Sequence, residues 1–191
     1  MIAKKQGAVF LSSHFGNIEI CRAWAREFPE VKLNAIFYLQ NAAKFNTVLR
    51  AMNQNVTLNV YSPHEMTIET GILFQQKVDA GEWIFVMADR VLSETKGRIV
   101  KSNFLGEPVE LPMGPFAMAD VLRVPIFAMH CYRQEGKLNV SLKPLQSRQG
   151  LNREQRFGLL ANEYVGEIER LVKVAPLQWF NFYKFWKSHA E

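Results

Sequence analysis

The sequence predicts an α/β fold, with a central mixed, mostly parallel β-sheet flanked by helices. Short apolar runs alternate with runs of helical period along most of the chain, which is typical of this class. Hydrophobic residues make up 48% of the 191 positions, so the chain can bury one substantial core. No internal repeat or linker interrupts the pattern. We therefore expect a single domain over residues 1–191, lacking an N-terminal segment, because the first candidate site comes only fourteen residues in.

Six apolar runs have the length and composition of buried strands. They are Gly7 to Ser12, Lys32 to Tyr38, Asn55 to Val60, Trp83 to Ala88, Val124 to Tyr132 and Lys137 to Pro144. The first four are separated by segments long enough for crossover helices, as parallel strands require. The last two are separated by Gln134-Glu135-Gly136, which predicts a hairpin.

Helical periods predict the connecting helices. They are Gly16 to Phe28, Asn41 to Asn53, Met66 to Ala80 before a stop at Gly81, and Pro115 to Leu122. A longer helix follows the cap residue Asn152. Its apolar stripe is Phe157, Leu160, Ala161, Tyr164, Ile168, Leu171 and Val172, with Glu154, Glu163, Glu167 and Lys173 outside it. Leu92 to Met113 is the longest stretch for which we expect irregular structure.

Composition excludes several classes of protein. The 23 basic and 18 acidic residues give a formal charge of +5 without a block of like charges, which favours an acidic partner but no nucleic acid. No apolar segment reaches the roughly 18 residues that span a bilayer, so we expect a soluble or peripheral chain. Cys21 and Cys131 are expected to be buried thiols. Metal-ligand spacings, a phosphate loop and a serine-hydrolase elbow are absent, so no metal or cofactor is expected.

His14 stands where the first strand is predicted to end, and Glu19 falls in the first turn of the next helix. In open α/β sheets, ligands bind at the carboxyl ends of the strands. A histidine beside a carboxylate can accept a proton from a hydroxyl group. The alternative is that His14 caps the corner and Glu19 is an ordinary first-turn acid. Asn17, between the two, is a candidate substrate-binding residue.

Asp89 and Arg90 follow a strongly apolar strand, so they would reach the same sheet edge. Asp89 can orient His14 in place of Glu19 or along with it, and Arg90 can bind a phosphate or a developing oxyanion. The alternative is a surface salt bridge between Asp89 and Arg90, which would contribute little.

Two later stretches are further candidates. Between Arg98 and Phe116, glycine and proline residues favour a rigid turn close to a ligand; the candidate binding residues there are Arg98, Lys101, Pro112 and Gly114. The stretch from Trp179 to Trp186 is mostly aromatic, which suits either a lipid-facing edge or packing on the core. We expect packing for most of these rings, and Gln178 is then placed to reach the site.

Four blocks together resemble the bacterial lipid A biosynthesis acyltransferase family of the lysophospholipid acyltransferase superfamily. The blocks are His14-Phe15-Gly16-Asn17-Ile18-Glu19, Ala88-Asp89-Arg90, Phe104-Leu105-Gly106 through Leu111 to Pro115, and Gln178 to Trp186. The ending Trp179-Phe180-Asn181-Phe182-Tyr183 is most similar to acyltransferases associated with glycosyltransferases or aryl-polyene clusters.

The resemblance implies a glycerolipid acyltransferase-like fold and an HxxxxE active site. His14 would deprotonate an acceptor hydroxyl that attacks an acyl thioester of acyl carrier protein or coenzyme A. Glu19 or Asp89 would orient the imidazole. The acceptor would be a lipid, glycolipid or polyene, and the location would be peripheral, at the cytoplasmic side of the bacterial inner membrane. A non-catalytic lipid- or carrier-binding module and a thioesterase are the alternatives.

Overall fold

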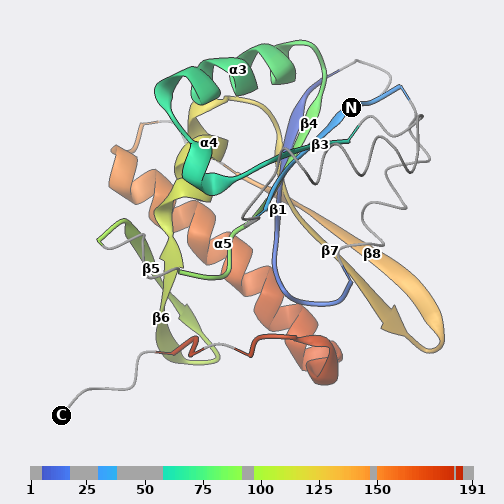
Figure 1. Cartoon of the computed structure of the whole chain (residues 1–191). Coiled ribbons are helices and arrows are strands. Elements are labelled where there is room, and N and C mark those ends of the chain that lie inside the picture. The colour runs from blue at the N-terminus through green and yellow to red at the C-terminus, as the bar shows by residue number, and fades with distance from the viewer. Residues whose placement is uncertain are drawn as a thin grey trace.

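A six-stranded sheet forms the centre of the molecule (Figure 1). The computed structural model describes residues 6–17, 30–37, 58–91, 97–146, 150–182 and 184–186. The strand order is β3-β2-β4-β1-β7-β8, and all neighbours are parallel except β7 and β8. Strand bounds are β1 Ala8–Ser12, β2 Leu33–Ile36, β3 Leu58–Tyr61, β4 Trp83–Met87, β7 Ile126–Gln134 and β8 Lys137–Leu145. The predicted fold class and the β7–β8 hairpin are confirmed.

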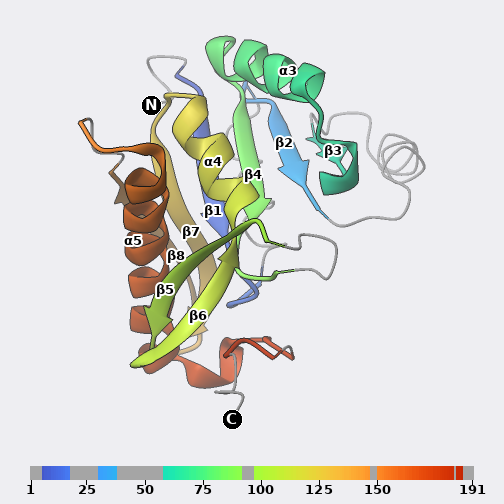
Figure 2. The same cartoon turned by 90° about the vertical axis from the view of Figure 1, so that its left-hand side faces the viewer.

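Three α-helices are described: α3 Ile68–Asp79, α4 Met113–Val121 and α5 Arg153–Val174. Short 3-10 turns cover Pro63–Glu65 (η2) and Pro176–Gln178 (η4). Figure 2 shows α5 running along one side of the sheet. Gly16 does not begin a helix, as it forms an isolated bridge to Cys131. Residues 18–28 of that predicted helix, and the helix predicted from Asn41 to Asn53, lie outside the described residues.

Local sequence sets the helix ends. Thr67 caps α3 in a reciprocal capping box with Thr70, and Asn152 caps α5 in the same way with Gln155. Gly81, just past the end of α3, has φ of +85°, the left-handed conformation that glycine adopts without strain. The predicted cap and stop are confirmed.

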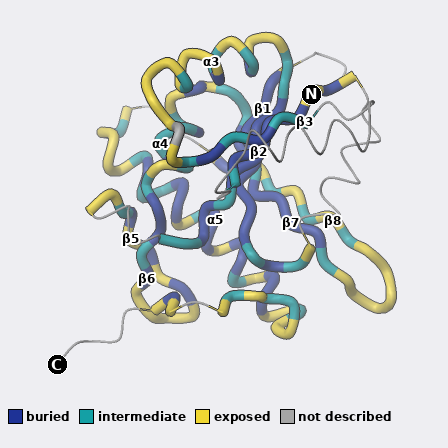
Figure 3. Tube along the Cα trace, viewed as in Figure 1, coloured by how far each residue is buried: buried dark blue, intermediate teal, exposed yellow. Residues whose placement is uncertain are grey.

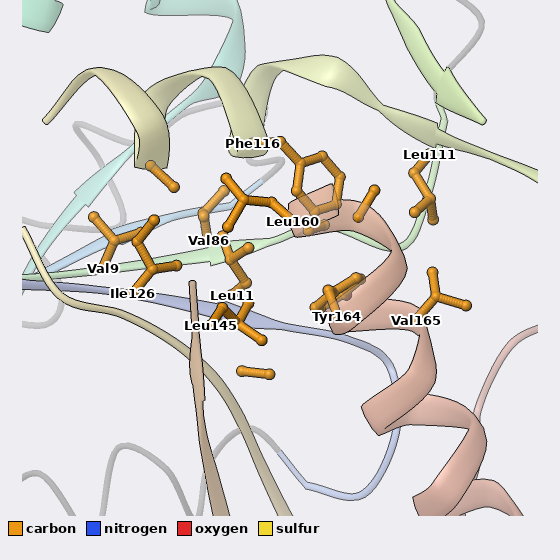
Figure 4. Packing of buried hydrophobic residues seen from close by; sticks show 14 of the residues in the cluster. Val9, Leu11, Val86, Leu111, Phe116, Ile126, Leu145, Leu160, Tyr164 and Val165 are labelled. Atoms are coloured by element: carbon orange, nitrogen blue, oxygen red, sulfur yellow. The ribbon is translucent and has the colours of Figure 1, made fainter. Parts of the chain in front are cut away.

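The central strands of the sheet are buried on both faces, as Figure 3 shows. In β1, Val9 and Leu11 face a cluster that includes residues of α3, α4 and α5, and Figure 4 shows part of it. Ala8 and Phe10 face the opposite cluster, where Phe10 stacks on Phe85 with ring centroids 4.6 Å apart. Because both faces are covered, the central strands consist of continuous apolar runs rather than alternating ones.

The region expected to be irregular between Leu92 and Met113 contains a hairpin, so that prediction was wrong. Strands β5 Ile99–Phe104 and β6 Glu107–Pro112 pair antiparallel. Residues of β5 alternate between buried and partly or fully exposed, which is the pattern of a strand covered on one face. The hairpin packs on α5, where the Ser102 hydroxyl donates to Asn162 Oδ1 over 2.7 Å. Its proline and glycine residues are typical of a loop, which is why the sequence pattern misleads here.

The apolar stripe of α5 is buried as predicted, but Glu167 is buried too, at 3% exposure. The sequence pattern places it outside the stripe. The Ser141 hydroxyl and the Arg170 guanidinium both donate to its carboxylate. Burial raises the pKa of Glu167, but these hydrogen bonds outweigh burial and hold the pKa below its ordinary value. A carboxylate with such partners can lie inside the protein at little cost.

The aromatic C-terminal segment divides into packed and exposed rings. Trp179 and Phe185 both pack on Phe104 of β5, with centroid distances of 4.9 and 5.3 Å. Trp186 donates its indole N–H to the Phe104 carbonyl. The packing prediction is confirmed for these rings, whereas Phe182 is 92% exposed.

Candidate active site

The register of β1 and β4 brings His14 and Asp89 together. Ser12, at the end of β1, lies opposite Met87 at the end of β4. His14 comes two residues after Ser12, and Asp89 comes two residues after Met87. Between the two strand ends, the Ala88 amide donates to the Ser12 carbonyl over 2.9 Å. Both side chains therefore emerge from adjacent parallel strands at the carboxyl edge of the sheet, where α/β proteins bind ligands.

Asp89 holds His14 through three contacts. His14 Nδ1 lies 2.9 Å from Oδ1 and 3.0 Å from Oδ2 of the carboxylate, and the His14 backbone amide donates to Oδ2 over 2.8 Å. The Asp89 side chain is 1% exposed, while that of His14 is 32% exposed. The carboxylate is thus fixed beneath an imidazole that still reaches solvent.

This geometry determines what the imidazole can do. An ionised carboxylate only accepts hydrogen bonds, so Nδ1 carries a proton and Nε2 holds the free lone pair. Nε2 lies on the side of the ring away from Asp89, available to a group arriving from outside. If Nε2 takes a proton, the buried carboxylate stabilises the resulting charge. The arrangement suits a general base.

The C-terminal segment is hydrogen-bonded to residues 14–17, which we call the His14 segment. The Gly16 amide donates to the Gln178 carbonyl over 2.7 Å, and the Phe180 amide donates to the His14 carbonyl over 2.8 Å. Arg90 Nη2 donates to the Phe180 carbonyl over 2.9 Å. Arg90 therefore lies beside the His14 segment, and its role as a basic residue of the site stays a prediction.

Strand β7 is also hydrogen-bonded to the His14 segment. The Asn17 amide donates to the Cys131 carbonyl over 2.8 Å, next to the bridge between Gly16 and Cys131. Gly16 has φ of +71°, and a Cβ there would lie 1.9 Å from the Cys131 carbonyl oxygen. Only glycine fits this position.

Replacing Gly16 with Ala is therefore expected to destabilise the protein by roughly 2 kcal/mol or more, because the left-handed backbone conformation disfavours Ala and the methyl group collides with β7. Gly136→Ala is the matched control: Gly136 has φ of +74°, but a Cβ added there would meet no atom within 4 Å. Urea unfolding measures both losses. Equal losses would contradict the steric argument.

A pocket of about 410 Å³ lies beside the His14 segment. It is lined by Gly16, Asn17, Cys131, Tyr132, Arg133, Leu138, Gln178 and Phe180. The predicted residue Gln178 faces it, but the Gln178 side-chain amide accepts from the Arg133 amide and donates to the Arg133 carbonyl. Gln178 thus joins η4 to β7. Sequence reasoning missed the contribution of β7, because backbone contacts leave no side-chain signature.

The other predicted binding residues lie on and beside the β5–β6 hairpin. Lys101 is on the exposed face of β5, and Arg98 precedes that strand. Pro112 ends β6 and is the N-cap of α4, with Gly114 in the first turn, where an added Cβ would meet no atom within 4 Å. The described contacts do not join these four residues to His14 or Asp89. Glu19 lies outside the described residues.

His130, on β7, is a second histidine near the pair. Its ring is fully buried, and neither Nδ1 nor Nε2 has a hydrogen-bond partner in the described part of the chain. Burial lowers the pKa of His130 to about 4; the charges of Glu167 and Asp89 oppose this shift and that of Arg170 adds to it. The ring is therefore neutral at neutral pH.

The buried imidazole makes stability depend on pH. Because the folded pKa lies below the ordinary value, the unfolded chain binds more protons at acidic pH. This contribution to stability is complete above about pH 6.5 and is lost as pH falls toward 4, by up to roughly 3 kcal/mol. Urea unfolding measures the free energy of unfolding of His130→Phe minus that of the wild type. This difference should be more positive at pH 4.5 than at pH 7, because the variant lacks the buried imidazole. A constant difference at both pH values would contradict this prediction.

The described residues contain neither a metal cluster nor a membrane span. Within the ranges that the structure describes, no group of three or more His, Cys, Asp or Glu side chains is placed to hold a metal ion. No helix in those ranges is both long and apolar enough to cross a membrane.

A mostly parallel α/β sheet with a buried Asp and a solvent-reaching His at its carboxyl edge is an arrangement that suits a general base. The family model described as bacterial lipid A biosynthesis acyltransferase matches residues 1–188, so the chain belongs to that family. The resemblance seen in the sequence is confirmed, and membership indicates acyl transfer to a lipid acceptor. No curated protein matches the chain by sequence.

Proposed function

We propose that this protein is an O-acyltransferase that moves a fatty acyl group from an acyl thioester to a hydroxyl of a lipid, glycolipid or polyene acceptor. The observation that carries the proposal is the contact of 2.9 Å between His14 Nδ1 and the buried carboxylate of Asp89. Family membership supplies the reaction class, and this pair supplies a base suited to it.

In this mechanism, His14 Nε2 accepts the proton of the acceptor hydroxyl as its oxygen attacks the thioester carbonyl carbon. The C–S bond then breaks, and the imidazolium returns the proton to the departing thiolate. Asp89 orients the ring and stabilises its charged form. Arg90, 2.9 Å from the Phe180 carbonyl, supplies positive charge beside the reacting groups.

The donor is an acyl thioester of acyl carrier protein or coenzyme A. Both carry phosphate groups, and acyl carrier proteins are acidic, so the formal charge of +5 supports either donor. Peripheral contact with the cytoplasmic face of the inner membrane would bring the acceptor to the site. Leu177 and Phe182, which are 93% and 92% exposed, flank the C-terminal residues that are hydrogen-bonded to the His14 segment. Exposed apolar side chains of this kind favour a lipid surface.

The alternatives differ from an acyltransferase in a way that one experiment separates. A non-catalytic binding module has no need of a buried carboxylate that orients an exposed imidazole. A thioesterase would use the same pair but would deliver the acyl group to water.

The test is to incubate the purified protein with acyl thioesters of acyl carrier protein or of coenzyme A and a hydroxyl-bearing glycolipid. Thiol release together with a new ester is expected. Free fatty acid as the sole acyl product would identify a thioesterase, and no thiol release from either donor would favour the binding module. Both of these results would overturn the proposal.

A further inference from the structure

The Ser12 carbonyl joins the two strands that carry His14 and Asp89. It accepts the Ala88 amide over 2.9 Å, one residue before Asp89, and lies two residues before His14. The same oxygen accepts a second hydrogen bond, from the Tyr164 hydroxyl over 2.7 Å. The Ser12 hydroxyl donates to the Met129 carbonyl of β7 over 2.9 Å. Ser12 is therefore linked to two other strands and to α5.

Tyr164 reaches this point from the middle of α5. It is completely buried, and Figure 4 shows it between α5 and the end of β1. Its ring packs on Phe116 of α4, with centroids 5.6 Å apart, and lies 6.3 Å from the ring of His130. Packing on several sides gives the hydroxyl one well-defined position.

The Tyr164 hydroxyl remains a donor throughout the working pH range. Burial, and next the negative charge of Asp89, raise the pKa of Tyr164 well above its ordinary value. A buried carbonyl that accepts two hydrogen bonds is constrained more strongly than one in an ordinary strand pair.

We propose that Tyr164 is a positioning residue: its hydroxyl fixes the Ser12 carbonyl, and thereby the spacing and angle at which His14 meets Asp89. This inference rests on the proposed function of that pair. Helix α5 thus contributes to the reaction without touching substrate. The apolar stripe of α5 predicts only that Tyr164 is a core residue, which leaves the hydroxyl unexplained.

The kinetic test is Tyr164→Phe, which keeps the ring and removes the hydroxyl. We expect kcat to fall roughly tenfold, the factor that about 1.4 kcal/mol of transition-state stabilisation supplies, while KM for both substrates stays within about twofold. Tyr61→Phe removes a hydroxyl from β3 as a control. Val165→Ala truncates a buried neighbour on α5 and controls for lost stability. Both controls should keep the wild-type kcat.

A spectroscopic test needs no activity, so it separates this proposal from the proposed function. In protein labelled with ¹⁵N-histidine, the proton on His14 Nδ1 should give a downfield resonance that Asp89→Asn removes, which assigns it. Tyr164→Phe should broaden that resonance or move it upfield, and Val165→Ala should leave it in place. An unchanged resonance in folded Tyr164→Phe overturns the proposal, as does an unchanged kcat in an active enzyme.

Discussion

Replacing His14 with Ala is expected to lower kcat for acyl transfer by a factor of about a hundred to ten thousand. That is the range supplied by a positioned general base. The imidazole of His130 cannot substitute, because it is fully buried and the hydrogen bonds of Asp89 are made to His14 itself. Steady-state measurement of ester formation, with thiol release followed in parallel, gives the size of the loss.

The control for this variant is His64→Ala. His64 is exposed on η2, so its removal should leave kcat unchanged. Urea unfolding of His14→Ala establishes that the protein is folded, and added imidazole should restore part of the rate by occupying the space left by the side chain. A folded His14→Ala protein that keeps more than about a tenth of the wild-type kcat would refute the assignment of His14 as base.

The strand ends and two candidate partners of His14 could be predicted from the sequence, but the choice between Glu19 and Asp89 could not. Apolar runs bounded by polar residues place His14 and Asp89 at strand ends. Whether those strands are neighbours depends on the strand order, and β4 pairs with β1 although β2, β3 and α3 intervene in the chain. Glu19 stood out because it is five residues away, whereas Asp89 is 75 residues away. The sequence therefore leaves both carboxylates open, because the contact with Asp89 depends on the pairing of β1 with β4.

Backbone pairing accounts for most of what sequence reasoning missed. The hydrogen bonds that hold Gly16 and His14 to the C-terminal segment use amides and carbonyls, which nearly every residue possesses. Gly16 was the one available signal, because a glycine directly after a strand can mark a close approach of two chains. The buried Glu167 was missed for a related reason: its partner Ser141 comes from β8, which no property of α5 reveals.

The second large effect is expected at Asp89, where Asn should lower kcat roughly a thousandfold. Asn keeps the size of the side chain but replaces one oxygen by an NH₂ donor. If that group faces Nδ1, the imidazole carries its proton on Nε2 and can no longer accept one from the acceptor hydroxyl. The loss of negative charge also removes the stabilisation of the imidazolium. We therefore expect a loss in kcat with little change in KM.

Two further carboxylates provide the comparison. Glu19→Gln should lower kcat by less than about tenfold if Asp89 alone orients the ring, and a larger loss there than at Asp89 would reverse the assignment. Asp120→Asn is the control for burial: Asp120 is also poorly exposed and lies 2.9 Å from Arg156, but that pair joins α4 to α5. It should affect stability and leave kcat unchanged. Of these three carboxylates, only one that contacts the imidazole should lower kcat without equal loss of stability, because the charge that it stabilises develops on His14 during the reaction.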